Sequence, residues 1–421
     1  MTQRLTLVLL TMLTATQAPA QSTDLAATCT DVCLYGATSN GANCALWDAA
    51  VGDWVRNPTD GPGELHNRAR HYATVLHRWM LPAGGVMSTR FTDASLTEVA
   101  DYGGRRDSAI WTGAYLASEA LRFLSTGAPD AARSIDETVA TLHRWWRIPG
   151  DPGYLARYAA PADSPAPVQA ILSADDPEVH REVPFEDALW HWRGNISRDQ
   201  YQGVLLGYSL AYQATSNPEV RETIRQDVVE FVEQLMSGER RPVRISVNGR
   251  ATTREVSIPY AVFSTADAPD GIPSLTFQTD PFSAAGEGVL FFAPNATDLL
   301  NQIFGFSPFP SLPQPTQAIQ LAAIFRVALQ VTDDVPAYAS RRQAIAEHYE
   351  RQLRSKQETI AGRERGGSPA VRPGGNESRP VQSQTAAFAG LGRDAGADFT
   401  ALNRIVYAAQ PSRFRLRSTS S

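Results

Sequence analysis

Apolar and polar residues follow the period of an α-helix over several long stretches of the chain. Stretches 107–124 and 130–147 each carry one broad apolar stripe, so we expect two amphipathic helices joined by a short turn. Stretches 197–212 and 219–236 repeat this arrangement. The same periodicity predicts helices at three further places: 64–80, 316–331 and 337–355.

The two helical pairs repeat each other at a constant offset. Phe123 and Pro129 recur as Tyr212 and Pro218, each 89 residues further along the chain, and a looser third copy surrounds Leu329. Proline suits the first turn of the second helix because its missing N–H would have no partner there. Helical hairpins that each carry an apolar face must stack to bury it, which favours a closed toroid or an open solenoid.

We therefore predict a mainly α fold of repeated helical hairpins that forms an (α/α)-toroid or part of one, over residues 64–360. A small β-hairpin is expected within 240–263, where two alternating stretches flank an Asn-Gly turn. Stretches 149–184 and 265–316 are rich in proline or glycine and predict loops.

The N-terminal end predicts export. Residues 1–20 hold one charged side chain, an apolar core and a small-residue Ala-Pro-Ala site, which together are typical of a secretory signal peptide. The apolar run Leu5–Leu13 is far shorter than the ~20 residues that a spanning helix needs, so no stable membrane span is expected. We predict a secreted or periplasmic protein, and an uncleaved anchor or a plain disordered start is the alternative.

Two further segments flank the helical domain. Residues 21–63 contain the cysteines of the chain: Cys29, Cys33 and Cys44. Export allows a disulfide among them, although the odd number leaves one cysteine over. The alternative, a zinc site, needs a fourth ligand that the sequence does not offer, so no metal site is predicted. Residues 361–382 are polar and rich in Gly, Arg and Ser, which predicts a disordered linker before a tail at 383–421.

Composition narrows the class of partner. Apolar residues make up 43% of the chain, which is enough for a sizeable core. The net charge of −6 argues against a nucleic-acid partner, because proteins that bind nucleic acid usually carry a basic patch. The sequence has no phosphate-binding loop, dinucleotide fingerprint or nucleophile elbow, and no cofactor is predicted.

The first helix of each pair opens with the same chemistry. Asp107 is followed by Trp111 and a glycine, and Asp199 is followed by Tyr201 and a glycine. Two such carboxylates can serve as general acid and base, or as acid and nucleophile, at a glycosidic bond. An Asp at a helix start also caps the helix and suits the positive end of its dipole, so both interpretations stay open.

Glycines and a possible capping box near these helix starts also require a structural or functional explanation. Glycine inside a helix costs ~1 kcal/mol relative to alanine. Gly113, Gly203 and Gly207 therefore indicate close helix packing or the close approach of a ligand. Ser197 and Gln200 have the spacing of a capping box at the start of the 197–212 helix.

Aromatic residues indicate a surface that faces sugar. Trp190, His191 and Trp192 form a polar-aromatic run in a predicted loop, and such loops are disproportionately binding loops. Flat rings stack on sugar faces, although core packing is the alternative. Arg157 can bind a carboxylate through two hydrogen bonds, or it can cap a helix. The predicted substrate-binding residues are Trp111, Arg157, Trp190, His191, Trp192 and Tyr201.

Two motifs at helix starts carry a family resemblance: Asp107-x3-Trp111-x-Gly113 and Asp199-x-Tyr201-x-Gly203. With the repeated hairpins over residues 64–355, they resemble the six-hairpin (α/α)6 glycosidase-like superfamily, in which the unsaturated glucuronyl and rhamnogalacturonyl hydrolases are nearest. The resemblance implies aspartates at helix ends around one face of the ring, here Asp107 and Asp199, as the catalytic groups. The chain departs from the family because it predicts fewer hairpins than the six of a full ring.

These observations predict an exported carbohydrate-active protein, a glycoside hydrolase or lyase-like enzyme that acts on an oligosaccharide or polysaccharide. Asp199 is expected to be the acid/base and Asp107 its partner. The alternative is a non-catalytic helical-repeat protein that binds a glycan or a protein partner. Two aspartates that lie close together favour the enzyme, because paired carboxylates must flank one bond.

Overall fold

The computed structural model describes residues 46–48, 53–55, 73, 75–93, 98–238, 240–247, 249–277, 285–292, 315–333 and 335–354. The chain divides into two compact units. In the first, Met1–His77 with Thr92–Glu98, strands β1 (Leu46–Asp48) and β2 (Asp53–Val55) pair antiparallel. The second, Arg78–Phe91 with Val99–Ser421, contains all the residues of the predicted site.

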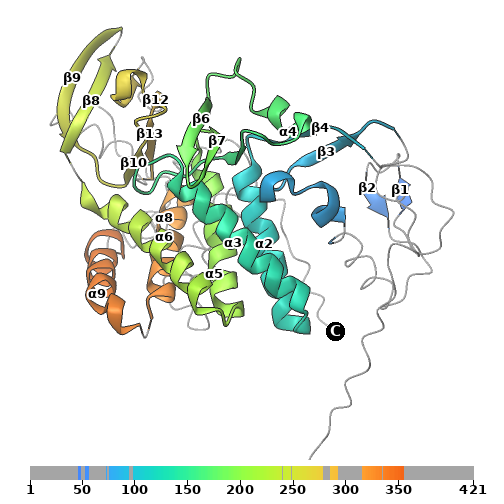
Figure 1. The fold of residues 1–421 in the computed structure, drawn as a ribbon. Coiled ribbons are helices and arrows are strands. Elements are labelled where there is room, and N and C mark those ends of the chain that lie inside the picture. Colours follow the sequence, from blue (N-terminus) through green and yellow to red (C-terminus); the bar gives the residue numbers. More distant parts are fainter. Residues whose placement is uncertain are drawn as a thin grey trace, which may run out of the picture. The chain divides into compact units, whose positions relative to one another are not determined.

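Two helical hairpins lie side by side in the second unit (Figure 1). The first consists of α2 (Ser108–Thr126) and α3 (Pro129–Arg147), and the second of α5 (Arg198–Ala214) and α6 (Pro218–Ser237). A further pair is α8 (Pro315–Val331) and α9 (Ala339–His348), which the π-helix η6 (Tyr349–Arg354) extends. The short helical elements are η3 (Pro82–Gly84), α4 (Ala166–Ile171), η4 (Pro269–Gly271) and η5 (Pro336–Tyr338).

Both hairpins form with nearly the predicted bounds, and local signals explain their turns. Gly127 ends α2 with a φ of 66°, a left-handed conformation that glycine adopts without steric cost. Pro129 and Pro218 each occupy the first position of the second helix. The side chain of Asn217 caps α6 by accepting a hydrogen bond from the N–H of Glu219. The constant offset in the sequence therefore marks equivalent positions in the two hairpins.

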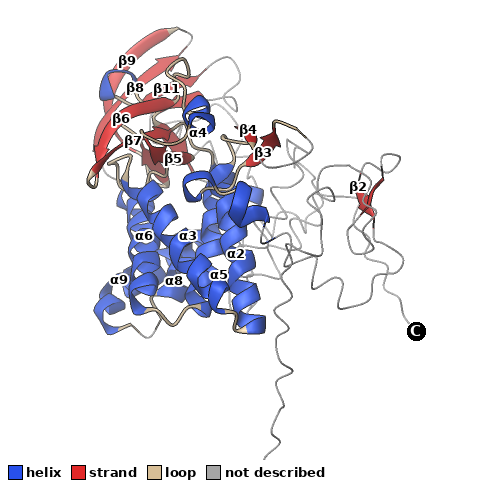
Figure 2. Ribbon diagram, turned by 45° about the vertical axis from the view of Figure 1, so that its right-hand side comes forward, coloured by secondary structure: helices blue, strands red, loops and turns tan. Residues whose placement is uncertain are grey.

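Strands gather at one end of these helices (Figure 2). Their bounds are β3 (Ser88–Phe91), β4 (Val99–Gly103), β5 (Tyr158–Pro161), β6 (Val179–Phe185), β7 (Ala188–Arg193), β8 (Arg240–Val247), β9 (Arg250–Ser257), β10 (Ala261–Phe263), β11 (Ser274–Phe277), β12 (Ala285–Glu287) and β13 (Val289–Phe291). One sheet has the order β5-β7-β6 and another β12-β11-β8-β9, in which β8 and β11 run parallel. The remaining pairs, β3 with β4 and β10 with β13, are antiparallel.

The prediction of a mainly α toroid with one small β-hairpin is wrong. The described part of the chain is mixed α/β, with 52% of its residues in helices and 22% in strands. The hairpin of β8 and β9 is confirmed, but the expected loops at 149–184 and 265–316 also contain strands. Most of these strands have only three or four residues, and β5, which reads Tyr-Ala-Ala-Pro, is almost wholly buried. An alternation over so few residues does not mark a strand in the sequence.

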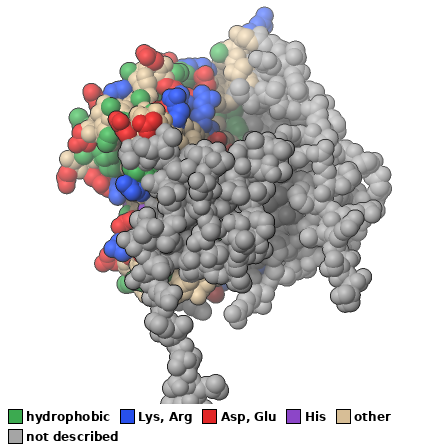
Figure 3. Space-filling model, turned by 90° about the vertical axis from the view of Figure 1, so that its right-hand side faces the viewer, with side chains coloured by type: hydrophobic (Ala, Val, Ile, Leu, Met, Phe, Trp, Pro, Cys, Tyr) green, Lys and Arg blue, Asp and Glu red, His purple; other side chains and the backbone are tan. Residues whose placement is uncertain are grey.

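Two apolar cores support this arrangement. The larger one runs through the helical hairpins and reaches the β5-β7-β6 sheet, with Leu142, Tyr201 and Phe231 among its fully buried members. The smaller one lies under the β12-β11-β8-β9 sheet and includes Val243 and Leu275. On the described part of the face in Figure 3, acidic and basic side chains are interspersed.

Some predicted features lie outside the described residues. They are the signal peptide at 1–20, Cys29, Cys33 and Cys44, most of the helix at 64–80, the linker at 361–382 and the tail at 383–421. Export and a disulfide therefore stay predictions. Within the described ranges, every helix is too short or too polar to cross a bilayer.

Candidate functional site

Helices α2 and α5 pack in parallel and very close together. A methyl group on Gly203 would lie 2.6 Å from the Cα of Ile110, and one on Gly207 would lie 2.5 Å from the carbonyl oxygen of Gly113. These contacts advance in the same direction along both helices, so the two N-termini lie at the same end. Close helix packing, the first of the two predicted reasons, thus explains the three glycines Gly113, Gly203 and Gly207.

The side chain of Gln200 joins the two helix starts. Its Oε1 accepts a hydrogen bond from the N–H of Ile110 at 2.9 Å, and its Nε2 donates to Oδ1 of Asp107 at 3.1 Å. Gln200 is fully buried and caps α2, the neighbouring helix. The predicted capping box within α5 is wrong, because Gln200 points across to α2 and Ser197 makes no capping hydrogen bond to its own helix.

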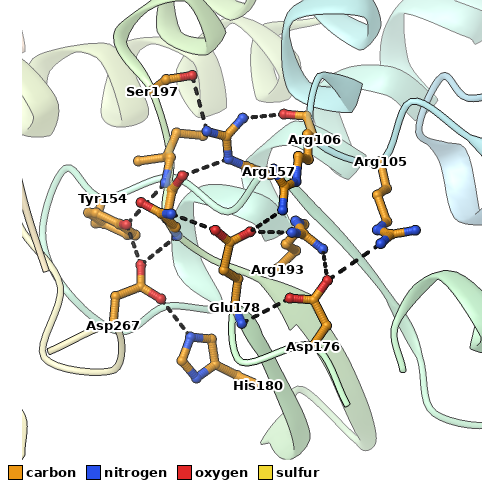
Figure 4. Close-up of polar contacts among 12 residues, drawn as sticks. Arg105, Arg106, Tyr154, Arg157, Asp176, Glu178, His180, Arg193, Ser197 and Asp267 are labelled. Atoms are coloured by element: carbon orange, nitrogen blue, oxygen red, sulfur yellow. Dashed lines mark hydrogen bonds and ion pairs between the residues drawn. The ribbon is translucent and has the colours of Figure 1, made fainter. Parts of the chain in front are cut away.

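Arg157 connects the segments that precede both helices (Figure 4). Its Nε donates to the carbonyl oxygen of Asn195 at 2.7 Å, its Nη2 donates to Oγ of Ser197 at 3.2 Å, and its Nη1 donates to the carbonyl oxygen of Arg106. These bonds use three of the five N–H groups of a guanidinium. Arg157 therefore ties the start of α2 to the start of α5 and keeps N–H groups for a further acceptor.

Both candidate carboxylates lie near enough to this guanidinium to act on it through their charge. Burial lowers the pKa of Arg157, and the carboxylates of Asp199 and Asp107 oppose that shift through their charge. Asp107 is exposed, whereas Asp199 is partly buried. The Oδ1 of Asp199 is buried and has no hydrogen-bond partner among the described residues. The two predicted aspartates therefore both lie near Arg157, but Asp107 is exposed to solvent and Asp199 is partly buried.

A network of ion pairs lies beside Arg157 (Figure 4). Arg193 is fully buried and donates to Asp176 and Glu178, and Asn195 donates to the other oxygen of Glu178 at 2.6 Å. Arg105 adds a longer ion pair with Asp176, at 3.6 Å. Burial raises the pKa of the Asp176 carboxyl, but the hydrogen bonds from Arg193 and from the N–H of Glu178, with the charges of Arg193 and Arg105, together bring it below its usual value. This network holds the strand end of β7 and the turn that leads into α5.

Asp267 fixes the same turn from the opposite side. Its carboxylate accepts hydrogen bonds from Nε2 of His180 at 2.7 Å, from the N–H of Asn195 at 2.8 Å and from the hydroxyl of Tyr154. Burial alone raises the pKa of Asp267, but these hydrogen bonds and the neighbouring His180 bring it below its usual value. The turn before Asp199 is thus held by a buried, charged acceptor.

Among the predicted sugar-binding residues, Trp111 is the exposed one, at 53%. Tyr201, Trp190, His191 and Trp192 are buried. Trp192 stacks on His180 with ring centres 4.1 Å apart, and the hydroxyl of Tyr201 donates to the carbonyl oxygen of Gly153 at 3.1 Å.

The prediction that Trp190, His191 and Trp192 lie in a binding loop is therefore wrong. Residues 188–193 form β7, the central strand of its sheet, and the rings of Trp190 and Trp192 are buried core members. A buried ring cannot present its face to a sugar, so core packing, the alternative, applies to them. Sequence reasoning missed Gln200 as a link between helices and missed the network of Arg193. The signal available for Arg193 was its position after the strand-like Trp-His-Trp run.

Comparison of the chain with models of known protein families, with curated proteins and with solved structures finds no match. The resemblance to the six-hairpin glycosidase-like superfamily therefore stays a prediction.

Proposed function

We propose that this protein is an exported carbohydrate-active enzyme, a glycoside hydrolase or lyase that uses Asp107 and Asp199 as paired carboxylates. The observation that carries the proposal is the adjacency of the starts of α2 and α5, which Gln200 joins through Asp107 and Arg157 joins through Arg106 and Ser197. An oligosaccharide or polysaccharide is the substrate, in keeping with the export signal of the sequence.

The different surroundings of the two carboxylates support different roles. Acid and base roles at a glycosidic bond are divided between two carboxyl groups by their environments. Asp199, partly buried, is assigned as the acid/base and Asp107, exposed and held by Gln200, as its partner. Arg157 fixes the separation of the two because it is bonded to both helix starts.

Trp111 supplies the contact with the sugar ring. It lies one helical turn after Asp107 and therefore on the same face of α2. Its large exposed fraction leaves a flat apolar surface beside the carboxylate. Aromatic faces of this kind bind the apolar face of a sugar ring.

Turnover by designed variants tests this function. Mature protein is incubated with neutral and uronic-acid oligosaccharides, and products are measured by mass spectrometry. Asp199→Asn and Asp107→Asn are each expected to lower kcat by about 100-fold or more, since a general acid or base contributes at least that factor. Products with a new double bond identify a lyase, and products that have gained water identify a hydrolase.

Asp130→Asn is the matched control. Asp130 also lies in the first turn of a helix, α3, but it is 62% exposed and pairs with Arg122. Its substitution is expected to leave kcat unchanged. If the wild type binds oligosaccharides without turning any over, and Asp199→Asn binds them equally well, the protein is a binding protein and the proposed activity is wrong.

A further inference from the structure

Strand β9 forms a free edge of the sheet β12-β11-β8-β9. It is the last strand in the order of the sheet and lies on the outside of the second unit in both ribbon views (Figure 1 and Figure 2). All of its side chains except Val256 are exposed. An edge strand of eight residues offers a row of backbone groups to which a further strand can add.

The pairing of β9 with β8 decides which backbone groups of β9 point outward. Only two residues join the strands, so the pair Val247–Arg250 beside the turn is hydrogen-bonded. Hydrogen-bonded and non-hydrogen-bonded pairs alternate along an antiparallel ladder, which makes Pro242–Glu255 a non-hydrogen-bonded pair. Pro242 fits this position because proline has no N–H to donate to the neighbouring strand.

The open part of the edge centres on Ala251 and Thr253. Both residues belong to non-hydrogen-bonded pairs with β8, so their N–H and C=O groups point away from β8 and toward the free edge. At the next such position, the carbonyl oxygen of Glu255 accepts a hydrogen bond from Nη2 of Arg240 at 3.2 Å. Ala251 and Thr253 therefore offer the backbone donors and acceptors that an added strand needs.

The charge of this edge is positive. Arg250 and Arg254 are exposed, and neither forms an ion pair with another described residue. Residues four apart in a strand lie on the same face of the sheet, so both guanidinium groups are on one side of the edge. Strands β8 and β9 together contain five arginines and one glutamate, whereas the whole chain has a net charge of −6.

We propose that β9 is a docking edge for an extended acidic segment of a partner protein, which adds to the sheet as an outer strand. The backbone groups of Arg250 and Arg254 bond to β8, so the pairs that the partner forms with these two residues are non-hydrogen-bonded. Side chains come closest in such pairs, and opposite charges there stabilise the sheet. The partner therefore carries Asp or Glu at two positions four residues apart. A second copy of β9 is a poor partner because it brings the same arginines.

Peptide binding to the mature protein tests the charge of the partner. The probe is a fluorescein-labelled peptide, Thr-Asp-Val-Thr-Val-Asp-Thr, and its affinity is measured by fluorescence anisotropy. The double variant Arg250→Glu with Arg254→Glu is expected to weaken binding about tenfold or more, because two attractive cross-strand pairs become repulsive. Arg133→Glu, at an exposed position on α3, makes a similar change of charge elsewhere and is expected to leave the affinity unchanged.

Thr253→Pro tests whether the peptide adds as a strand. The substitution removes an N–H that points outward and makes no bond to β8, so the melting temperature is expected to stay close to that of the wild type. Peptide binding is expected to weaken about fivefold or more, because the backbone donor is lost. Wild-type affinity in this variant would mean that the arginines bind the peptide without strand addition, and the proposal would be wrong.

Three further outcomes would overturn the proposal. The first is equal affinity for the Asp peptide and for the same peptide with Asn at both positions. The second is no binding at peptide concentrations up to about 1 mM, in which case the arginines serve only to keep the sheet edge from pairing. The third is a dimer of the mature protein in sedimentation that Arg254→Glu converts to a monomer, which would assign the edge to a second copy of the chain.

Discussion

At the scale of single residues, Asp267 joins distant parts of the chain at the turn before α5. It accepts hydrogen bonds from His180, Tyr154 and the backbone of Asn195. Gly194 is needed beside it, since a methyl group there would lie 2.6 Å from Cγ of Asp267. The position of Asp199, which follows this turn, therefore depends on a carboxylate far along the sequence.

Asp267 is expected to make the free energy of unfolding decrease as the pH falls into the acid range. Its pKa is lower in the folded protein than in the unfolded chain, so the unfolded chain takes up the proton first as the pH falls. The stability that Asp267 contributes is complete above about pH 4 and is lost as the pH falls through the folded-state pKa. Urea midpoints measured from pH 6 to pH 3 should fall more steeply for the wild type than for Asp267→Asn.

The same variant has an effect at neutral pH. Asp267→Asn weakens the charged acceptor of three hydrogen bonds, and we expect a loss of about 1–3 kcal/mol in the free energy of unfolding. Equal pH slopes for the variant and the wild type would show that Asp267 does not carry the acid dependence.

At the scale of elements, the close approach of α2 and α5 depends on glycines, which have no side chain to separate the two helices. Gly203→Ala brings a methyl group against the carbonyl oxygen and the Cα of Ile110, which move only if the whole helix moves. We expect a loss of about 3 kcal/mol in the free energy of unfolding, measured by urea denaturation. Turnover should fall as well, because separation of the helices displaces Asp107 from Asp199.

Gly103→Ala is the control for this prediction. A methyl group at Gly103 meets only the hydroxyl of Ser88, at 2.7 Å, and that group can rotate away. The expected loss is under about 1 kcal/mol. Equal losses for the two variants would mean that the close packing of α2 and α5 is not the sensitive feature.

At the scale of the whole second unit, its two apolar cores predict unequal local stability. Helices α5 and α6 pack in the larger core, whereas β9 is an edge strand that is exposed along most of its length. Local opening needs less free energy where few apolar contacts are buried. Hydrogen exchange should therefore be faster for the amides of β9 than for those of α5 and α6.

Strand β7 shows whether slow exchange depends on the core in which an element packs or on whether the element is a helix or a strand. It is the central strand of its sheet, and Trp190 and Trp192 belong to the larger core. Its amides are expected to exchange as slowly as those of the helices. Protection of β9 equal to that of β7 would contradict a difference between the two cores.

The sequence by itself determined the two helical hairpins, α2–α3 and α5–α6, and the place of the two aspartates at helix starts. Helical period, the glycine at the end of α2 and the prolines that open α3 and α6 are local signals, so they are readable without a fold. The Asn-Gly sequence between the paired strands β8 and β9 is a local signal in the same way.

Only the tertiary structure decided what surrounds those aspartates. The partner of Ile110 is Gln200, 90 residues further along the chain, and Arg157 reaches back to Arg106 over 51 residues. Trp190 and Trp192 are buried because β5 and β6 pair on either side of β7. The sequence pattern of these strands does not predict that pairing. Such contacts depend on how distant segments of the chain pack against each other, and a local sequence pattern does not predict that packing.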